Sequence, residues 1–116
     1  MKVSRSSEDR PVKAAPGRER RVAHTENLMM VVWDFTDGPA GEPDTLHTHP
    51  HEQVTYVVQG RVLFFSGEDS TRLEPGDMVA VAPGLPHSIQ TLTSHVRLID
   101  TFTPLRDEFI IDLSKP

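Results

Sequence analysis

The sequence predicts an all-β fold, an antiparallel β-sandwich or barrel formed by a single domain. First, 116 residues are enough for one hydrophobic core but not for two. Second, from about residue 22 onward, short apolar runs alternate at even spacing with clusters of Gly, Pro, Asp and Ser. Third, no convincing helical period interrupts this pattern.

Strands are expected, in chain order, at residues 28–35, 54–58, 62–65, 89–92 and 96–102. Turn-forming residues separate them at 37–43, 66–70, 74–77 and 83–86. The tripeptide Gln59-Gly60-Arg61 between the second and third strands is a hairpin signal, so we expect those two strands to pair.

Charge divides the chain into two parts. Residues 1–21 contain seven Lys/Arg and three Asp/Glu, whereas residues 22–116 contain five and fourteen. We therefore expect a basic, flexible N-terminal leader over 1–21 and the folded domain over 22–116. The acidic domain would repel phosphates and the leader lacks interleaved aromatics, so no nucleic-acid partner is expected.

Other classes of protein are excluded by composition. The chain has no cysteine, which rules out disulfides and thiolate metal sites. The longest apolar run, residues 28–33, is too short to span a membrane, and no membrane partner is expected. The first residues lack the apolar segment of a signal peptide, so a cytoplasmic location is expected.

A candidate metal site begins with His47, His49 and Gln53. Alternate residues of a strand share a face, and all three are odd-numbered, so they can point into one cavity if Pro50 leaves the alternation intact. His87 is the candidate fourth ligand because it follows a rigid Pro/Gly-rich turn. Imidazole and amide donors accept several divalent ions, so zinc, nickel, iron and manganese are not distinguished.

The neighbouring polar residues have other expected roles. Glu52 is a better ligand than Gln53 chemically, but its position in the alternation points it away from the histidines. His51 is expected at the rim of the cavity or behind the ligands. His24 and His95 are expected to be surface or hydrogen-bonded residues.

Asp100 is the second unusual feature, because it shares an inward-facing strand face with Val96, Leu98 and Phe102. An unpaired buried charge is unfavourable. Two alternatives stay open: Asp100 pairs with Arg97, Arg106 or a backbone group, or it is a cavity acid/base with a raised pKa.

These residues resemble the two signature motifs of the cupin family, G-x5-H-x-H-x3,4-E-x6-G and G-x5-P-x-G-x2-H-x3-N. His47, His49, Gln53 and Gly60 match the first motif, and Gly76, Gly84 and His87 match the second. Gly41 supplies the leading glycine of the first motif. The chain departs from the motifs at three places, where Gln53 replaces glutamate, Ala82 precedes Pro83 in place of proline, and Thr91 replaces asparagine. The resemblance implies a jelly-roll barrel with one divalent metal ion held by His47, His49, Gln53 and His87.

Residues 26–30, the His-x-His-Pro-His-Glu-Gln motif and the Asp-x-Phe-x-Pro-x-Arg tail over 100–106 resemble the small KdgF-type cupins of pectin and alginate catabolism. This resemblance covers roughly residues 18–110. It implies conversion of 4,5-unsaturated uronate monomers to 5-keto-4-deoxyuronate, with Asp100, Phe102 and Arg106 in the active site. It also implies a homodimer and an anionic small-molecule substrate.

The neutral ligand set supports this chemistry, because it leaves the metal's +2 charge intact for Lewis-acid work on an anion. Two alternatives remain at the level of sequence. One is another metal cupin enzyme, such as a dioxygenase or a polyketide cyclase. The other is a sugar- or small-molecule-binding cupin without catalysis. Asp100 argues against this alternative, because binding of an anion gains nothing from a nearby carboxylate.

Overall fold

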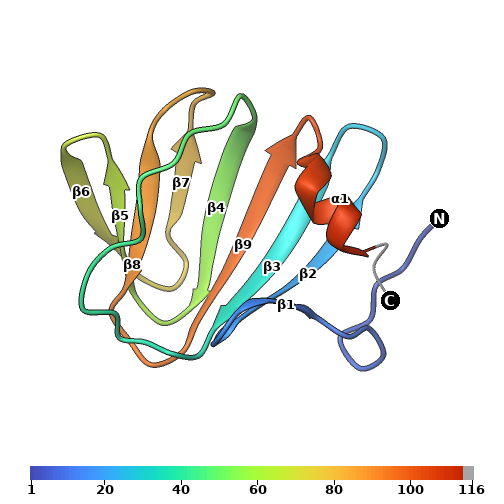
Figure 1. Cartoon of the computed structure of the whole chain (residues 1–116), viewed down its shortest axis with the longest axis horizontal. Helices are drawn as coiled ribbons and strands as arrows, with labels where there is room; N and C mark the ends of the chain where they lie inside the picture. Colours follow the sequence, from blue (N-terminus) through green and yellow to red (C-terminus); the bar gives the residue numbers. More distant parts are fainter. Residues whose placement is uncertain (114–116) are drawn as a thin grey trace.

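A computed structural model of the chain describes residues 1–113 as two antiparallel β-sheets and one short helix (Figure 1). The elements are β1 (Val12–Ala15), β2 (Arg18–His24), β3 (Met29–Phe35), β4 (Glu52–Gln59), β5 (Val62–Ser66), β6 (Asp69–Leu73), β7 (Met78–Val81), β8 (His87–Thr91), β9 (Val96–Thr103) and α1 (Asp107–Leu113). The predicted all-β class is confirmed, and the five predicted strands correspond to β3, β4, β5, β8 and β9.

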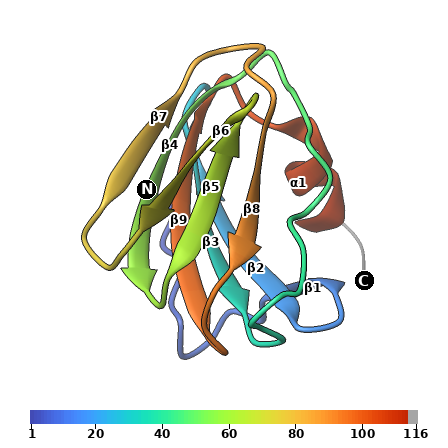
Figure 2. The ribbon, with the colours of Figure 1, turned by 90° about the vertical axis from the view of Figure 1, so that its left-hand side faces the viewer.

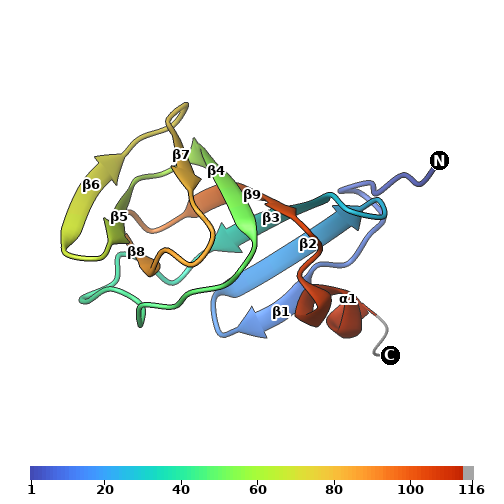
Figure 3. The same ribbon diagram turned by 90° about the horizontal axis from the view of Figure 1, so that it is seen from above.

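The two sheets face each other and enclose the core. The larger sheet has the order β1-β2-β3-β9-β4-β7, and the smaller has the order β6-β5-β8. Seen from above, the small sheet closes one end of the molecule against β4 and β7, while β2 and β3 extend the large sheet towards α1 (Figure 3). Turning the molecule shows β5, β6 and β8 in front of the large sheet (Figure 2).

The apolar residues form two adjoining clusters. Between the sheets lie Phe35, Val57, Val62, Phe64, Leu73, Val81, Val96 and Leu98. Beside the helix lie Met29, Val31, Phe102 and Phe109. Trp33 packs against both clusters, so the helix and the barrel share one continuous apolar interior.

The hairpin predicted across Gln59-Gly60-Arg61 is wrong, because β4 and β5 lie in different sheets. Gly60 has a φ of 77°, and a Cβ atom there would lie 2.2 Å from the carbonyl oxygen of His95. The glycine thus lets the chain pass closely under another turn as it changes sheets. A turn signal indicates that the chain reverses, but not which strand it pairs with next.

The structure also contains elements that the sequence patterns did not predict, namely β1, β2, β6, β7 and α1. β2 pairs along its whole length with β3, and β1 pairs with β2. Residues 12–21 belong to the range expected as a leader, yet here they form sheet. The division of the chain into a leader over 1–21 and a domain over 22–116 stays a prediction that limited proteolysis would test.

The segment between β3 and β4 carries His47, His49 and His51 and crosses in front of β8 (Figure 1). Four backbone hydrogen bonds hold it against the small sheet: Ala40, Asp44 and His47 donate to Thr91, Ile89 and His87, and His87 donates back to His47. The segment therefore runs along β8, at the edge of the small sheet, with most of its residues exposed. In residues 1–113 no helix has the length and apolar character needed to cross a membrane.

Candidate functional site

Three of the predicted metal ligands come together at one end of the space between the sheets. His47 and His87 form an isolated antiparallel bridge, with backbone N–H···O distances of 3.0 and 2.9 Å. One ring nitrogen each of His47, His49 and His87 can be chosen so that all lie within 4.8 Å of one another. We call these three residues the histidine cluster. Three imidazoles at this separation can hold a single metal ion.

Gln53, the fourth predicted ligand, lies beside the cluster on the inner face of β4. Its side chain is 7% exposed, and its Oε1 lies 2.9 Å from Nε2 of His49. Its Nε2 donates a hydrogen bond to Oγ1 of Thr55 at 2.9 Å. Glu52 is exposed, as its position in the strand predicted.

The hydrogen bonds of the histidine rings favour metal binding. Nδ1 of His87 lies 2.7 Å from the carbonyl oxygen of Leu85, and Nδ1 of His49 lies 3.2 Å from that of His51. Carbonyl groups only accept, so each Nδ1 carries the proton and each Nε2 presents a lone pair. Nε2 of His87 is buried without a hydrogen-bond partner among the described residues.

His49 and Gln53 provide a further test of the donor set. With its proton on Nδ1, the neutral His49 ring presents a lone pair at Nε2. Gln53 also presents an acceptor there, because its amide N–H is committed to Thr55. Two acceptors 2.9 Å apart repel unless a cation lies between or beside them, so this pair fits a metal ion.

Electrostatics favour the ligand form of His47 and His49. Burial lowers the pKa of His47, and the nearby His87 adds to the effect. Burial also lowers the pKa of His49, with a further contribution from the positive charge of Arg106. Both shifts favour the neutral imidazole, which is the form that binds a metal.

Asp100 lies on the inner face of β9, directly opposite Thr55 of β4. The Thr55 hydroxyl donates a hydrogen bond of 2.6 Å to Oδ1 of Asp100. Burial raises the pKa of Asp100 to about 6, although the Thr55 hydrogen bond and the charge of Arg106 oppose the rise. Of the two alternatives raised by the sequence, pairing with Arg97 is wrong, because Arg97 binds Asp34 at 2.9 and 3.2 Å.

A hydrogen-bonded path thus connects Gln53, the predicted ligand beside the histidine cluster, with Asp100. It runs from the Gln53 amide N–H to the Thr55 hydroxyl and from that hydroxyl to the carboxyl group. Thr55 is 2% exposed, and the sequence patterns did not single it out. The alternation along β4 could have found it, because Thr55 shares the inward face with Gln53.

Phe102 and Arg106 lie on the helix side of the cluster. Phe102 is 1% exposed, and its ring contacts that of His49 edge to face, with centroids 5.7 Å apart. The Arg106 guanidinium lies over the rings of Phe102 and Phe109, at 5.1 and 4.5 Å. Its Nε donates to Glu108 at 2.7 Å. Phe102 therefore supports His49 and Arg106 from behind.

A cavity of about 390 Å³ lies between the sheets, and most of these groups line it, while His49 and Phe102 lie behind its wall. His47, Gln53, Thr55, His87, Asp100 and Arg106 supply its polar wall, and Phe35, Phe64, Ile89 and Leu98 supply its apolar wall. The volume suits a small molecule about the size of a sugar. A small apolar pocket with a few converging polar groups is typical of a ligand site.

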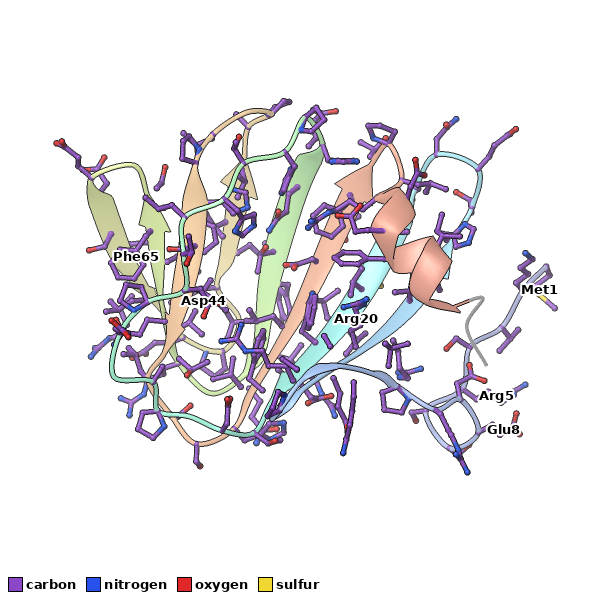
Figure 4. All side chains as sticks on the ribbon, in the orientation of Figure 1. Met1, Arg5, Glu8, Arg20, Asp44 and Phe65 are labelled. Atoms are coloured by element: carbon purple, nitrogen blue, oxygen red, sulfur yellow. The ribbon has the colours of Figure 1, made fainter. Side chains whose placement is uncertain are left out.

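An ion pair that the sequence did not predict also lines the cavity. Arg18, at the start of β2, donates two hydrogen bonds of 2.8 and 2.7 Å to the carboxylate of Asp44. Arg18 also lies over the ring of Phe35, at 5.2 Å. Figure 4 labels Asp44 on the segment in front of β8 and Arg20 below α1, on the other side of the space between the sheets.

The remaining histidines lie close to their expected places. His51 lies behind the cluster, with its Nε2 3.1 Å from the carbonyl oxygen of Leu105. His24 contacts the carbonyl oxygen of Thr25, and His95 lies 2.8 Å from the carboxylate of Asp34. None of these three belongs to the metal-ligand group found among the described residues.

Comparison with known proteins gives the same picture at the level of family. The family model described as a cupin domain matches residues 34–102. The pectin degradation protein KdgF of Dickeya dadantii (strain 3937) is 30% identical over 94 residues, covering 80% of this chain and 83% of that protein.

Two solved structures share both fold and sequence with this chain. KdgF from Halomonas sp. superimposes with a TM-score of 0.81 at 33% identity, covering 90% of this chain and 95% of that one. An RmlC-like cupin from Shewanella frigidimarina NCIMB 400 superimposes with a TM-score of 0.81 at 30% identity, covering 91% and 93%. Both similarities extend beyond the residues matched by the family model.

Proposed function

We propose that this chain, which belongs to the cupin family, is a metal-dependent enzyme that converts 4,5-unsaturated uronate monomers to the open-chain 5-keto-4-deoxyuronate. The similar protein of Dickeya dadantii is described as a pectin degradation protein, and pectin is a polymer of uronates. One observation carries the proposal: a cavity acid with a raised pKa is joined by hydrogen bonds to a neutral metal-ligand set.

His47, His49, Gln53 and His87 would hold one divalent ion. When bound, the ion would act as a Lewis acid on an oxygen of the substrate, with its charge undiminished by the neutral ligands. Because no carboxylate belongs to this set, the site differs from the two-histidine, one-carboxylate sites typical of iron oxygenases. This difference favours the proposed reaction over a dioxygenase.

Asp100 would transfer the proton. Opening the ring breaks the bond between the anomeric carbon and the ring oxygen, removes the proton of the anomeric hydroxyl, and adds a proton at C4. The reaction is an isomerisation, so one group can accept and return a proton without a co-reactant. A carboxyl with a pKa of about 6 exchanges protons readily near neutral pH.

Arg106 would bind the carboxylate of the substrate. It lines the cavity, and its side chain is only 18% exposed, so its charge is poorly screened there. Its present partner, Glu108, is 54% exposed and can turn into solvent when a substrate carboxylate takes its place. Phe102 would hold both His49 and Arg106 in position and exclude water behind them.

We also propose a homodimer. The outer face of the large sheet carries exposed apolar side chains on three strands, including Met30 on β3, Val54 and Tyr56 on β4, and Met78 on β7. Tyr56 and Met78 lie directly opposite each other in the register, and so form one patch. Such a patch is typical of an interaction surface. Analytical ultracentrifugation tests this: a monomer at micromolar concentration would contradict it.

The function is tested by incubating the metal-loaded protein with unsaturated galacturonate and unsaturated guluronate, and following the absorbance of the double bond. We expect the absorbance to fall faster than in a protein-free control. Metal-stripped protein should resemble that control, and re-addition of metal should restore the rate. Equal rates with and without protein on both substrates would contradict the proposal.

A further inference from the structure

Five side chains near the helix form a stack in which aromatic rings alternate with guanidinium groups. In order they are Trp33, Arg20, Phe109, Arg106 and Phe102. The Arg20 guanidinium lies 5.3 Å from the centroid of Trp33 and 4.5 Å from that of Phe109. The Arg106 guanidinium lies 4.5 Å from Phe109 and 5.1 Å from Phe102. We call this the guanidinium stack.

The stack joins three distant parts of the chain. Arg20 comes from β2 and lies directly opposite Trp33 of β3 in the register. Phe102 lies one residue before the end of β9, while Arg106 and Phe109 belong to the following turn and helix α1. Strand β2 and helix α1 therefore meet through side chains that contact the candidate site.

Arg20 is buried to a degree that is unusual for an arginine. It is 6% exposed, whereas Arg21 beside it is only half-buried and donates a hydrogen bond to the hydroxyl of Ser4. Successive residues of a strand point to opposite faces, so Arg20 faces the interior and Arg21 the exterior. Burying a guanidinium is unfavourable unless its contacts compensate, and two aromatic faces supply part of that compensation.

Phe109 connects the two arginines. Its ring is 6% exposed and lies within 4.5 Å of both guanidinium carbons. Arg106 cannot retreat from the cavity, because Phe109 and Phe102 both lie against it. The position of Phe109 in turn depends on Arg20 and on Trp33, whose ring is edge to face with it at 5.9 Å.

We propose that Arg20 is a positioning residue, which acts through Phe109 to hold the Arg106 guanidinium where it binds the carboxylate of an anionic ligand. The inference rests on the proposed function in one respect, namely that Arg106 receives that carboxylate. It adds a specific role for Arg20 of strand β2. Arg20 also brings a second positive charge near the cavity, which would increase the attraction of an anion.

A purely structural role for Arg20 makes a different prediction. If Arg20 only packs β2 against α1, its loss lowers stability and affects every ligand and every kinetic constant alike. If it positions Arg106, its loss weakens carboxylate binding and raises KM while kcat changes little. A variant changed at both Arg20 and Arg106 then binds the carboxylate ligand no more weakly than the variant changed at Arg106 alone, because both changes remove the same interaction.

The test measures galacturonate binding by calorimetry for the full chain and for Arg20→Met, Arg20→Lys, Arg106→Met and the double variant Arg20→Met/Arg106→Met. Galacturonate carries the carboxylate but lacks the 4,5-double bond, so binding is read without turnover. Arg21→Met is the matched control, since it removes the same charge from the neighbouring, outward-facing position. Thermal unfolding of each variant identifies any that does not fold.

We expect the Kd of Arg20→Met to rise about tenfold, that of Arg20→Lys to rise less, and that of Arg21→Met to stay unchanged. The double variant should match Arg106→Met. Equal Kd values for Arg20→Met and Arg21→Met, or multiplied losses in the double variant, would overturn the inference, as would absence of galacturonate binding by the unchanged protein. Normal galacturonate binding without turnover of the unsaturated uronates would overturn only the proposed reaction.

Discussion

The histidine cluster and the guanidinium stack border the same cavity, but the chain builds them differently. The cluster draws two of its members from residues 47–49 and joins them to His87 through a backbone bridge. The stack gathers side chains from β2, β3, the end of β9 and α1. The cluster is also neutral in its ligand form, whereas the stack brings two positive charges.

This difference separates two tasks. A neutral cluster, in which Nε2 of His87 is buried without a hydrogen-bond partner among the described residues, is suited to holding a metal ion, and the charged stack is suited to holding a carboxylate. Asp100 lines the same cavity and receives a hydrogen bond from Thr55, which in turn accepts one from Gln53 beside the cluster. Changes in one region should therefore affect metal content, and changes in the other should affect the binding of anions.

The largest expected effect is on the cluster. His87→Ala removes a ligand whose Nε2 is already buried without a partner among the described residues. We expect zinc affinity to fall by more than about 100-fold, since loss of an outer hydrogen-bond partner alone costs about 10- to 100-fold. Metal analysis after dialysis measures it. His24→Ala is the control and should keep its metal; equal metal content in both variants would contradict the ligand assignment.

The next effect is on the stack. Arg106→Met keeps the apolar contacts with Phe102 and Phe109 but removes the charge. We expect KM for an unsaturated uronate to rise about 10- to 100-fold, the range for hydrogen bonds to charged groups, without loss of metal. Steady-state kinetics measure it, with the exposed Arg61→Met as control. An unchanged KM would remove Arg106 from carboxylate binding.

A smaller effect concerns Asp100 and is measured through the pH dependence of the free energy of unfolding. Because burial raises the pKa of Asp100 to about 6, ionisation of Asp100 destabilises the fold. The native state then binds more protons than the unfolded state between about pH 4 and 6, so this contribution to stability falls as pH rises through that window. The loss of stability reaches up to about 3 kcal/mol above pH 6.

Asp100→Asn should therefore stabilise the metal-free protein at pH 7.5 and have little effect at pH 4. Urea unfolding at the two pH values measures this, and the exposed Asp69→Asn is the control. A variant less stable than the unchanged protein at pH 7.5 would show that the carboxylate is better compensated than its contacts indicate.

The smallest expected effect concerns Thr55. Its hydroxyl donates to Asp100 and so lowers the pKa of that carboxyl. Thr55→Val removes the donor. The midpoint of the rising limb of the pH–rate profile should therefore move upward by up to about one pH unit. A pH–rate profile measures the shift. Thr101→Val on the outer face of β9 should leave it in place, and a downward shift in Thr55→Val would contradict the hydrogen-bond assignment.

The sequence predicted the cluster better than the stack for a physical reason. His47, His49 and Gln53 lie close together in the chain, so a local motif could mark them, although only Gln53 lies on a strand and His47 and His49 belong to the segment before β4. The structure brings His47, His49 and His87 together, and places Asp100 on the inner face as expected. Nothing local, by contrast, relates Arg20 to Phe109, because their contact depends on where α1 packs.

The same reason explains the errors in the fold. Residues 12–24 are polar and charged, so their strands lack the apolar alternation that would have marked them. Arg18 and Arg20, which lie in the range expected as a leader, contact Phe35 and Trp33. Helix α1, at seven residues, is too short to show a period. The turn at Gly60 revealed a reversal, but the sheet assignment depends on distant pairing.

The most direct test of the account measures turnover and bound metal together in Asp100→Asn. The account predicts that this variant binds as much metal as the unchanged protein, while its turnover of an unsaturated uronate falls by about 10²- to 10⁴-fold, the usual contribution of an acid/base group. Full turnover in Asp100→Asn, or loss of its metal, would contradict the division between a metal-holding cluster and a separate proton-transfer group.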